Sequence, residues 1–128
     1  MIDYVTLGTR QLERAIAFYD AVLMTLGHSK FSVRDGWAGY GPNGVKTPPI
    51  LWLCPPFDGE APSIGNGTMV SFTAPTRDHV RRFHAAALAT GGTDEGAPGL
   101  RKYAPNWYGA YVRDPDGHKL SVVCRRAE

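Results

Sequence analysis

The four histidines are the first side chains to consider, because imidazole is a common metal ligand and a common acid or base near neutral pH. They are His28, His79, His84 and His118. His79 and His84 are five residues apart, so on a helix they would not share a face, and no His-x-x-x-His pair occurs. The histidines therefore do not predict a metal site. His118 is kept as a candidate acid or base because it follows a turn at the start of a predicted strand.

The segment Leu100–Gly109 (LRKYAPNWYG) is the second concentration of chemically useful side chains. Its aromatic and basic members, which could stack on a ring or pair with an anion, are Arg101, Lys102, Tyr103, Trp107 and Tyr108. The same residues could instead fill the core and a dimer contact. The segment Gly36–Pro49, with Trp37 and Tyr40, is the matching candidate in the first half of the chain.

The composition excludes several partners. The net charge is +2 and the basic residues are scattered, so we expect no nucleic-acid partner. The longest nearly apolar run, Ala15–Leu26, is interrupted by Asp20 and is too short to span a bilayer, so we expect no membrane partner. Residues 1–4 show no secretory signal, and two cysteines are too few for a disulfide scaffold. We therefore expect a cytoplasmic protein with free, buried thiols.

Two copies of one pattern position these side chains. A shift of 65 residues places Val5 on Val70, Phe18 on Phe83 and Gly27 on Gly92, and a shift of 70 places Trp37 on Trp107, Gly39 on Gly109 and Cys54 on Cys124. Matches in constant order at constant spacing indicate an internal repeat. We predict one domain over residues 1–128, with module one at about 1–57, a linker at about 55–67 and module two at about 66–126.

Each module reads as a strand, a helix and three further strands. Alternating apolar residues predict strands at 4–7, 30–33, 37–40 and 50–54 in module one, and at 69–72, 99–103, 109–113 and 119–124 in module two. An apolar stripe from Leu12 to Leu26 predicts the first helix, which Gly27 ends. Thr76 caps the second helix, and Gly91 and Gly92 end it.

A βαβββ module repeated twice resembles the vicinal oxygen chelate superfamily, which holds glyoxalase I, extradiol dioxygenases, and bleomycin- and fosfomycin-resistance proteins. The segments that carry the resemblance are Asp3–Gly8, Ala17–Tyr19, Leu26–Gly27 and Asp114–Leu120. The resemblance covers essentially the whole chain. It implies an α+β fold in which each module is an incomplete barrel with its helix outside, and in which paired modules enclose a cavity within the strands.

The resemblance also implies where metal ligands would stand. Metal-using members have a His where this chain has Tyr4, whose repeat partner is Met69, and a Glu where it has Ser121, whose repeat partner by the shift of 70 is Leu51. None of these four side chains offers the imidazole or carboxylate that a divalent metal prefers. We therefore expect no metal and no other cofactor.

Strand alternation then assigns the cavity wall. The residues predicted to face the cavity are Tyr4, Thr6, Leu51, Leu53, Met69, Ser71, Ser121 and Val123. Ile50, Trp52 and Cys54 are predicted to pack under the helices, with Cys54 and Cys124 in equivalent buried places. An apolar wall with a few hydroxyl groups is typical of a small-molecule site.

Three functions remain open from the sequence. The first is a metal-free binding protein that holds a small aromatic or amphipathic molecule, with a homodimer as its expected assembly; its candidate ligand-binding residues are Tyr4, Thr6, Leu51, Met69, Ser71, Arg101, Tyr103, Trp107, Tyr108 and Ser121. The second is a lactoylglutathione-lyase-like or dioxygenase-type enzyme. It would use a displaced metal, or Tyr4, Tyr103 or His118 as acid or base. The third is an interaction module whose cavity has collapsed.

Overall fold

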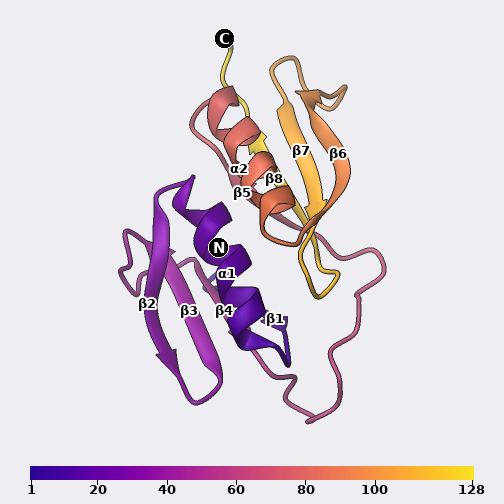
Figure 1. The fold of residues 1–128 in the computed structure, drawn as a ribbon. Helices are drawn as coiled ribbons and strands as arrows, with labels where there is room; N and C mark the ends of the chain where they lie inside the picture. Colours follow the sequence, from indigo (N-terminus) through magenta and orange to yellow (C-terminus); the bar gives the residue numbers. More distant parts are fainter.

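The computed structural model describes all residues from Met1 to Glu128 and contains two helices and eight strands (Figure 1). In chain order they are β1 (Tyr4–Gly8), α1 (Leu12–Met24), β2 (His28–Arg34), β3 (Trp37–Pro42), β4 (Ile50–Cys54), β5 (Val70–Thr73), α2 (Arg77–Ala89), β6 (Thr93–Leu100), β7 (Tyr108–Arg113) and β8 (Lys119–Cys124). The order is βαβββ twice. The predicted α+β fold of tandem modules is confirmed.

Each module forms its own four-stranded sheet. Sheet A has the order β1-β4-β3-β2 and sheet B has the order β5-β8-β7-β6. The first strand of each module pairs in parallel with the last, and the other neighbours are antiparallel. No ladder joins the two sheets, and neither sheet closes into a barrel. The free edges of β1 and β5 therefore meet no strand in this chain.

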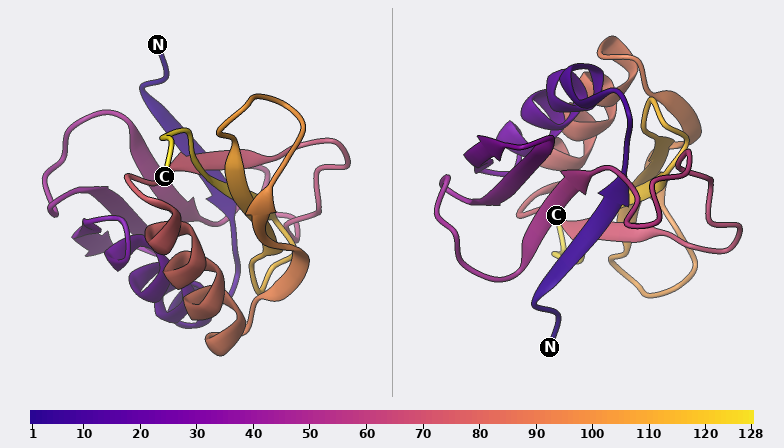
Figure 2. Two further views of the ribbon diagram at one scale, coloured as in Figure 1. Left: turned by 90° about the horizontal axis from the view of Figure 1, so that it is seen from above. Right: turned by 90° about the horizontal axis from the view of Figure 1, so that it is seen from below.

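The two helices build one core with both sheets. Helix α1 packs on sheet A, α2 packs on sheet B, and the helices lie side by side (Figure 2). The shared core includes Phe18 and Tyr19 of α1 and Phe83 of α2, all fully buried. This arrangement leaves the opposite face of each sheet, called the outer face below, turned away from the helices.

The helix ends follow the predicted chemistry. The Thr76 hydroxyl accepts a hydrogen bond from the backbone N–H of His79, which satisfies one of the free donors at the start of α2. Gly27 (φ 82°) and Gly91 (φ 95°) adopt the left-handed conformation just beyond the two helices. Neither helix has the length and apolar character needed to cross a membrane.

The turn that begins at Asp114 ties module two to module one. The Asp114 Oδ1 atom accepts hydrogen bonds from the backbone N–H groups of Asp116 and His118, both at 2.9 Å. Its Oδ2 atom accepts a hydrogen bond of 2.5 Å from the buried hydroxyl of Tyr19 on α1. Arg14 of α1 forms an ion pair with Asp116 at 2.9 Å. Burial and the adjacent Asp114 carboxylate raise the pKa of Tyr19 well above its ordinary value.

One predicted strand is in the wrong place. The strand expected at 99–103 is β6, which spans Thr93–Leu100 and pairs with β7 through two register shifts. Its sequence, TDEGAPGL, has two glycines and a proline and no apolar alternation. These residues are tolerated because β6 is an edge strand, where irregular pairing is least costly.

Candidate functional site

The outer face of sheet A differs from the prediction at β4. Along β1 and β4 this face carries Tyr4, Thr6, Ile50, Trp52 and Cys54. Leu51 and Leu53 lie on the opposite face, buried in the core that α1 covers. The prediction that Leu51 and Leu53 face the cavity is therefore wrong, and so is the prediction that Trp52 packs under a helix.

The cause is a one-residue error in the repeat offset. The equivalent pairs in the two parallel ladders are Val5 with Leu51 and Val70 with Leu120. These pairs give an offset of 69 for the last strands, whereas the Trp, Gly and Cys matches gave 70. A shift of one residue moves every side chain of a strand to the other face. The outer-face residue equivalent to Ser121 is thus Trp52.

The same error affects the two cysteines. Cys124 lies in the core, as predicted, but Cys54 lies on the outer face at the end of β4 and is not part of that core. Burial raises the pKa of the Cys54 thiol. Cys54 therefore remains a neutral, weakly polar part of the outer face rather than a reactive thiolate.

An aromatic cluster, here called the module-one cluster, covers the outer face of sheet A. It consists of Phe31, Trp37 and Trp52. The rings of Phe31 and Trp37 meet the Trp52 ring edge-on at centroid distances of 5.3 and 5.8 Å. A Cβ at Gly39 would come within 2.5 Å of the Trp52 ring, so only glycine leaves room for it there. The Lys46 ammonium lies 5.8 Å from the centre of the Trp52 ring.

Module two carries the corresponding cluster, here called the module-two cluster, made of Tyr103, Trp107 and Tyr111. Trp107 stacks on Tyr111 at 6.2 Å and meets Tyr103 edge-on at 5.1 Å. The Arg101 guanidinium and the Lys119 ammonium lie 5.6 and 5.7 Å from the Tyr111 ring centre. Two cations on one ring create a place where an anionic group would be stabilised.

Tyr108 does not belong to this cluster. Its ring lies on the helix side of sheet B, where the guanidinium groups of Arg77 and Arg81 cover it at 5.2 and 5.7 Å. Its hydroxyl accepts a hydrogen bond from Arg81. Tyr108, a candidate ligand-binding residue from the sequence, therefore does not join the cluster on the outer face, because it lies one residue out of phase with Trp107 and Gly109.

The two serines of sheet B, Ser71 and Ser121, lie on its outer face, as the alternation of side chains along a strand predicts. Ser71 and Ser121 are paired across the β5–β8 ladder. Val70 packs against the core, so its neighbour Met69 is on the opposite, outer face. Tyr111 stands opposite Ser121 on β7. The Ser121 Oγ atom is buried and has no hydrogen-bond partner. An unpaired buried hydroxyl is costly, so this atom marks a point on the outer face where a polar group would be favoured.

The donor set does not fit a divalent metal. The positions that the family resemblance assigns to ligands, corrected for register, hold Tyr4, Trp52, Met69 and Ser121. An indole and a thioether replace nitrogen and carboxylate donors, and a phenol and a hydroxyl group are weak ligands for a divalent metal. No group of three or more His, Cys, Asp or Glu side chains lies close enough together elsewhere to hold a metal ion.

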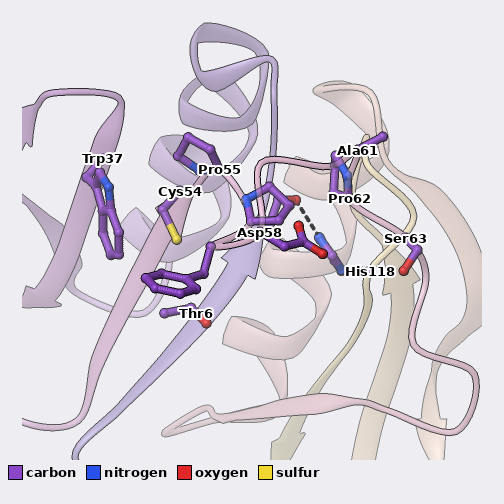
Figure 3. A pocket seen from close by; sticks show the side chains of 12 residues that line it. Thr6, Trp37, Cys54, Pro55, Asp58, Ala61, Pro62, Ser63 and His118 are labelled. Atoms are coloured by element: carbon purple, nitrogen blue, oxygen red, sulfur yellow. Dashed lines mark hydrogen bonds between the residues drawn. The ribbon is translucent and has the colours of Figure 1, made fainter.

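A pocket of about 390 Å³ adjoins the outer face of sheet A (Figure 3). The sheet supplies Thr6, Trp37 and Cys54, the linker 55–63 supplies the opposite wall, and His118 closes one end. The Nε2–H of His118 donates a 2.8 Å hydrogen bond to the carbonyl oxygen of Gly8. That bond fixes the ring between the modules.

The structure does not bring all predicted site residues together. Thr6 and His118 line the pocket, whereas Tyr4, Met69 and Tyr103 are exposed on the outer faces. Apart from its prolines, nothing in the linker sequence indicated that this segment would form a wall of the pocket. The sequence analysis did not predict four residues of the clusters and their surroundings, namely Phe31, Trp52, Tyr111 and Lys119. A correct assignment of the strand faces, starting from Trp37 and Trp107, would have placed them on the outer faces.

A model of the Glyoxalase/Bleomycin resistance protein/Dioxygenase superfamily matches residues 1–122 of the chain. No curated protein matches it significantly. The chain is 34% identical to a glyoxalase/bleomycin resistance protein from Albidiferax ferrireducens T118, whose crystal structure superposes with a TM-score of 0.88 over 98% of this chain and 99% of that one.

More distant structures share the fold. A glyoxalase-related enzyme from Fulvimarina pelagi has 20% identity and a TM-score of 0.76, covering 97% of this chain and 87% of its own. A glyoxalase/bleomycin resistance protein/dioxygenase family enzyme from Burkholderia phytofirmans PsJN has 20% identity and a TM-score of 0.72, covering 97% and 98%.

Proposed function

Because the chain belongs to the glyoxalase/bleomycin resistance protein/dioxygenase superfamily, yet its donor positions hold no metal-binding side chains, we propose that it binds a small aromatic molecule without a metal. The ligand lies on the outer faces of the sheets. The observation that carries this proposal is the pair of aromatic clusters, one on each outer face.

The chemistry of the two clusters sets the class of ligand. Stacked and edge-on rings favour a flat apolar body. Arg101 and Lys119 beside Tyr111 favour an anionic substituent, and the unpaired Ser121 hydroxyl favours a polar group on the same face. An aromatic carboxylate combines these features.

A homodimer would complete the site. Helix α1 covers one face of sheet A and α2 covers one face of sheet B, so a ligand on either outer face is covered by its own sheet on one side only. If module one of one chain faces module two of another, both aromatic clusters enclose the ligand. We therefore propose a homodimer, which light scattering after size exclusion would detect as twice the 14.0 kDa of one chain.

Tryptophan fluorescence tests the binding site. All three tryptophans, Trp37, Trp52 and Trp107, belong to the two clusters. We expect titration with 1-naphthoate to change their emission saturably and to raise the melting temperature, as any ligand of the native state does. No change in either signal at millimolar 1-naphthoate would refute the proposal.

A pair of variants tests the anionic part of the proposal. Arg101→Gln removes the guanidinium beside Tyr111, and we expect it to weaken binding of 1-naphthoate but not of neutral 1-naphthamide. Arg34→Gln is the matched control, because Arg34 is exposed and pairs only with its neighbour Asp35. Equal losses for both variants would show that the effect is only one of net charge.

A further inference from the structure

A second, more apolar pocket lies at the junction of the two modules, apart from the aromatic clusters. Its volume is about 440 Å³, within the range of small-molecule sites. Its wall includes Val5 of β1, Leu23 of α1, Leu51 of β4, and Val70 and Phe72 of β5. No tryptophan lines it. We call it the edge pocket, because β1 and β5 present their unpaired edges there.

The edge pocket contains one polar atom that lacks a partner. His28, the first residue of β2, lines the pocket, and its Nδ1 atom is buried without a hydrogen bond. Burial lowers the pKa of His28 below its ordinary value, so the ring is neutral near pH 7. A buried ring nitrogen that pairs with nothing is costly, and native structures usually satisfy such atoms.

The lining determines which chemical group could satisfy Nδ1. No Lys or Arg side chain lines the pocket, so no basic side chain would compensate a carboxylate or phosphate for its lost hydration. A hydroxyl group is neutral and can both donate and accept, so it suits either tautomer of the neutral imidazole. The Tyr40 hydroxyl does not serve, because it donates to Asp20 instead.

We propose that the edge pocket binds a small apolar molecule that carries one hydroxyl group, with this hydroxyl hydrogen-bonded to Nδ1 of His28 and the hydrocarbon part between β1 and β5. This site is independent of the ligand proposed for the outer faces.

Two probes of nearly equal shape test the proposal. 4-Ethylphenol carries the hydroxyl, and 4-ethyltoluene has a methyl group in its place. We expect 4-ethylphenol to shift the amide NMR signals of Val5, Val70 and Phe72 saturably, with an affinity at least about tenfold above that of 4-ethyltoluene. The tryptophan emission should not change.

Variants separate the hydrogen bond from the cavity. In His28→Leu, the two probes should bind with affinities within about twofold of each other. In His84→Leu, a control on α2 outside the lining, the preference for the phenol should persist. Val70→Trp, which fills the pocket, should abolish binding of both probes, and its melting curve would show whether it still folds.

Several outcomes would overturn the proposal. They are the absence of saturable binding by either probe, equal affinities for both probes in the unmodified protein, shifts confined to the outer faces, and a phenol preference that survives His28→Leu. None of them would refute the 1-naphthoate site, whose readout is tryptophan emission.

Discussion

Replacing Tyr19 by Phe should destabilise the protein by about 2 kcal/mol, although it removes a single oxygen atom. The Tyr19 hydroxyl donates a 2.5 Å hydrogen bond to Asp114 Oδ2, and both side chains are buried. Without the hydroxyl, Oδ2 loses its only side-chain donor. A buried hydrogen bond to a charged group contributes roughly 1.5–3 kcal/mol.

The expected loss converts to a measurable temperature shift. An unfolding entropy of about 2.1 cal/mol/K per residue gives roughly 0.27 kcal/mol/K for 128 residues. The melting temperature of Tyr19→Phe should thus fall by about 7 °C in differential scanning calorimetry. Tyr103→Phe is the matched control, because Tyr103 is exposed and its change should stay within about 0.5 kcal/mol.

A double-mutant cycle assigns the loss to the pair. Asp114→Asn keeps an oxygen for the backbone N–H groups of Asp116 and His118 but removes the charge. The coupling energy between Tyr19→Phe and Asp114→Asn should be at least about 1 kcal/mol. If Tyr19→Phe were no more destabilising than Tyr103→Phe, the hydrogen bond would not contribute as argued.

Three further predictions follow from the same structure. Because folding raises the pKa of Tyr19 and that of Tyr40, mainly by burial, these phenols ionise at lower pH in the unfolded chain than in the folded one. The free energy of unfolding should therefore fall as pH rises above about 10. Urea titrations at pH 9 and pH 11 should show that this free energy falls less in Tyr19→Phe than in the unmodified protein. Leu51→Glu places a carboxylate in the core and should cost at least about 3 kcal/mol in chemical denaturation, whereas Thr6→Glu on the outer face should cost under about 1 kcal/mol; equal costs would contradict the facing of these strands. Because the donor set does not fit a metal, EDTA followed by Zn²⁺ or Ni²⁺ should leave the melting temperature unchanged within about 1 °C, and a stoichiometric metal in elemental analysis would refute this.

The sequence predicts strands best where apolar alternation is strong. The strands at 50–54 and 119–124 match β4 and β8 in full, and the helix starts at Leu12 and Thr76 agree with the structure. β6 was misplaced because its Gly- and Pro-rich sequence has no alternation, and only pairing with β7 holds it extended. That pairing is a tertiary effect that local pattern does not encode.

The candidate site was predicted in part, and the failure has a geometric origin. Sequence matches at 70 residues put Cys54 on Cys124, but hydrogen-bond ladders put Leu51 on Leu120, at 69. Side chains alternate with a period of two, so the error exchanged the buried and open faces of β4. Ser71 and Ser121 were placed correctly because the shift of 65 holds for the first strands, and because the position of Ser121 came from the family resemblance rather than from the shift of 70.

The bonds from α1 to the turn at Asp114 and Asp116 have a consequence for how the chain comes apart. Separation of the halves, though each is a complete βαβββ unit, would break these bonds and expose the core that both halves share. The two halves should thus melt in a single cooperative transition. A chain nicked by a protease between Pro55 and Gly67 should stay assembled, its fragments parting only when both denature.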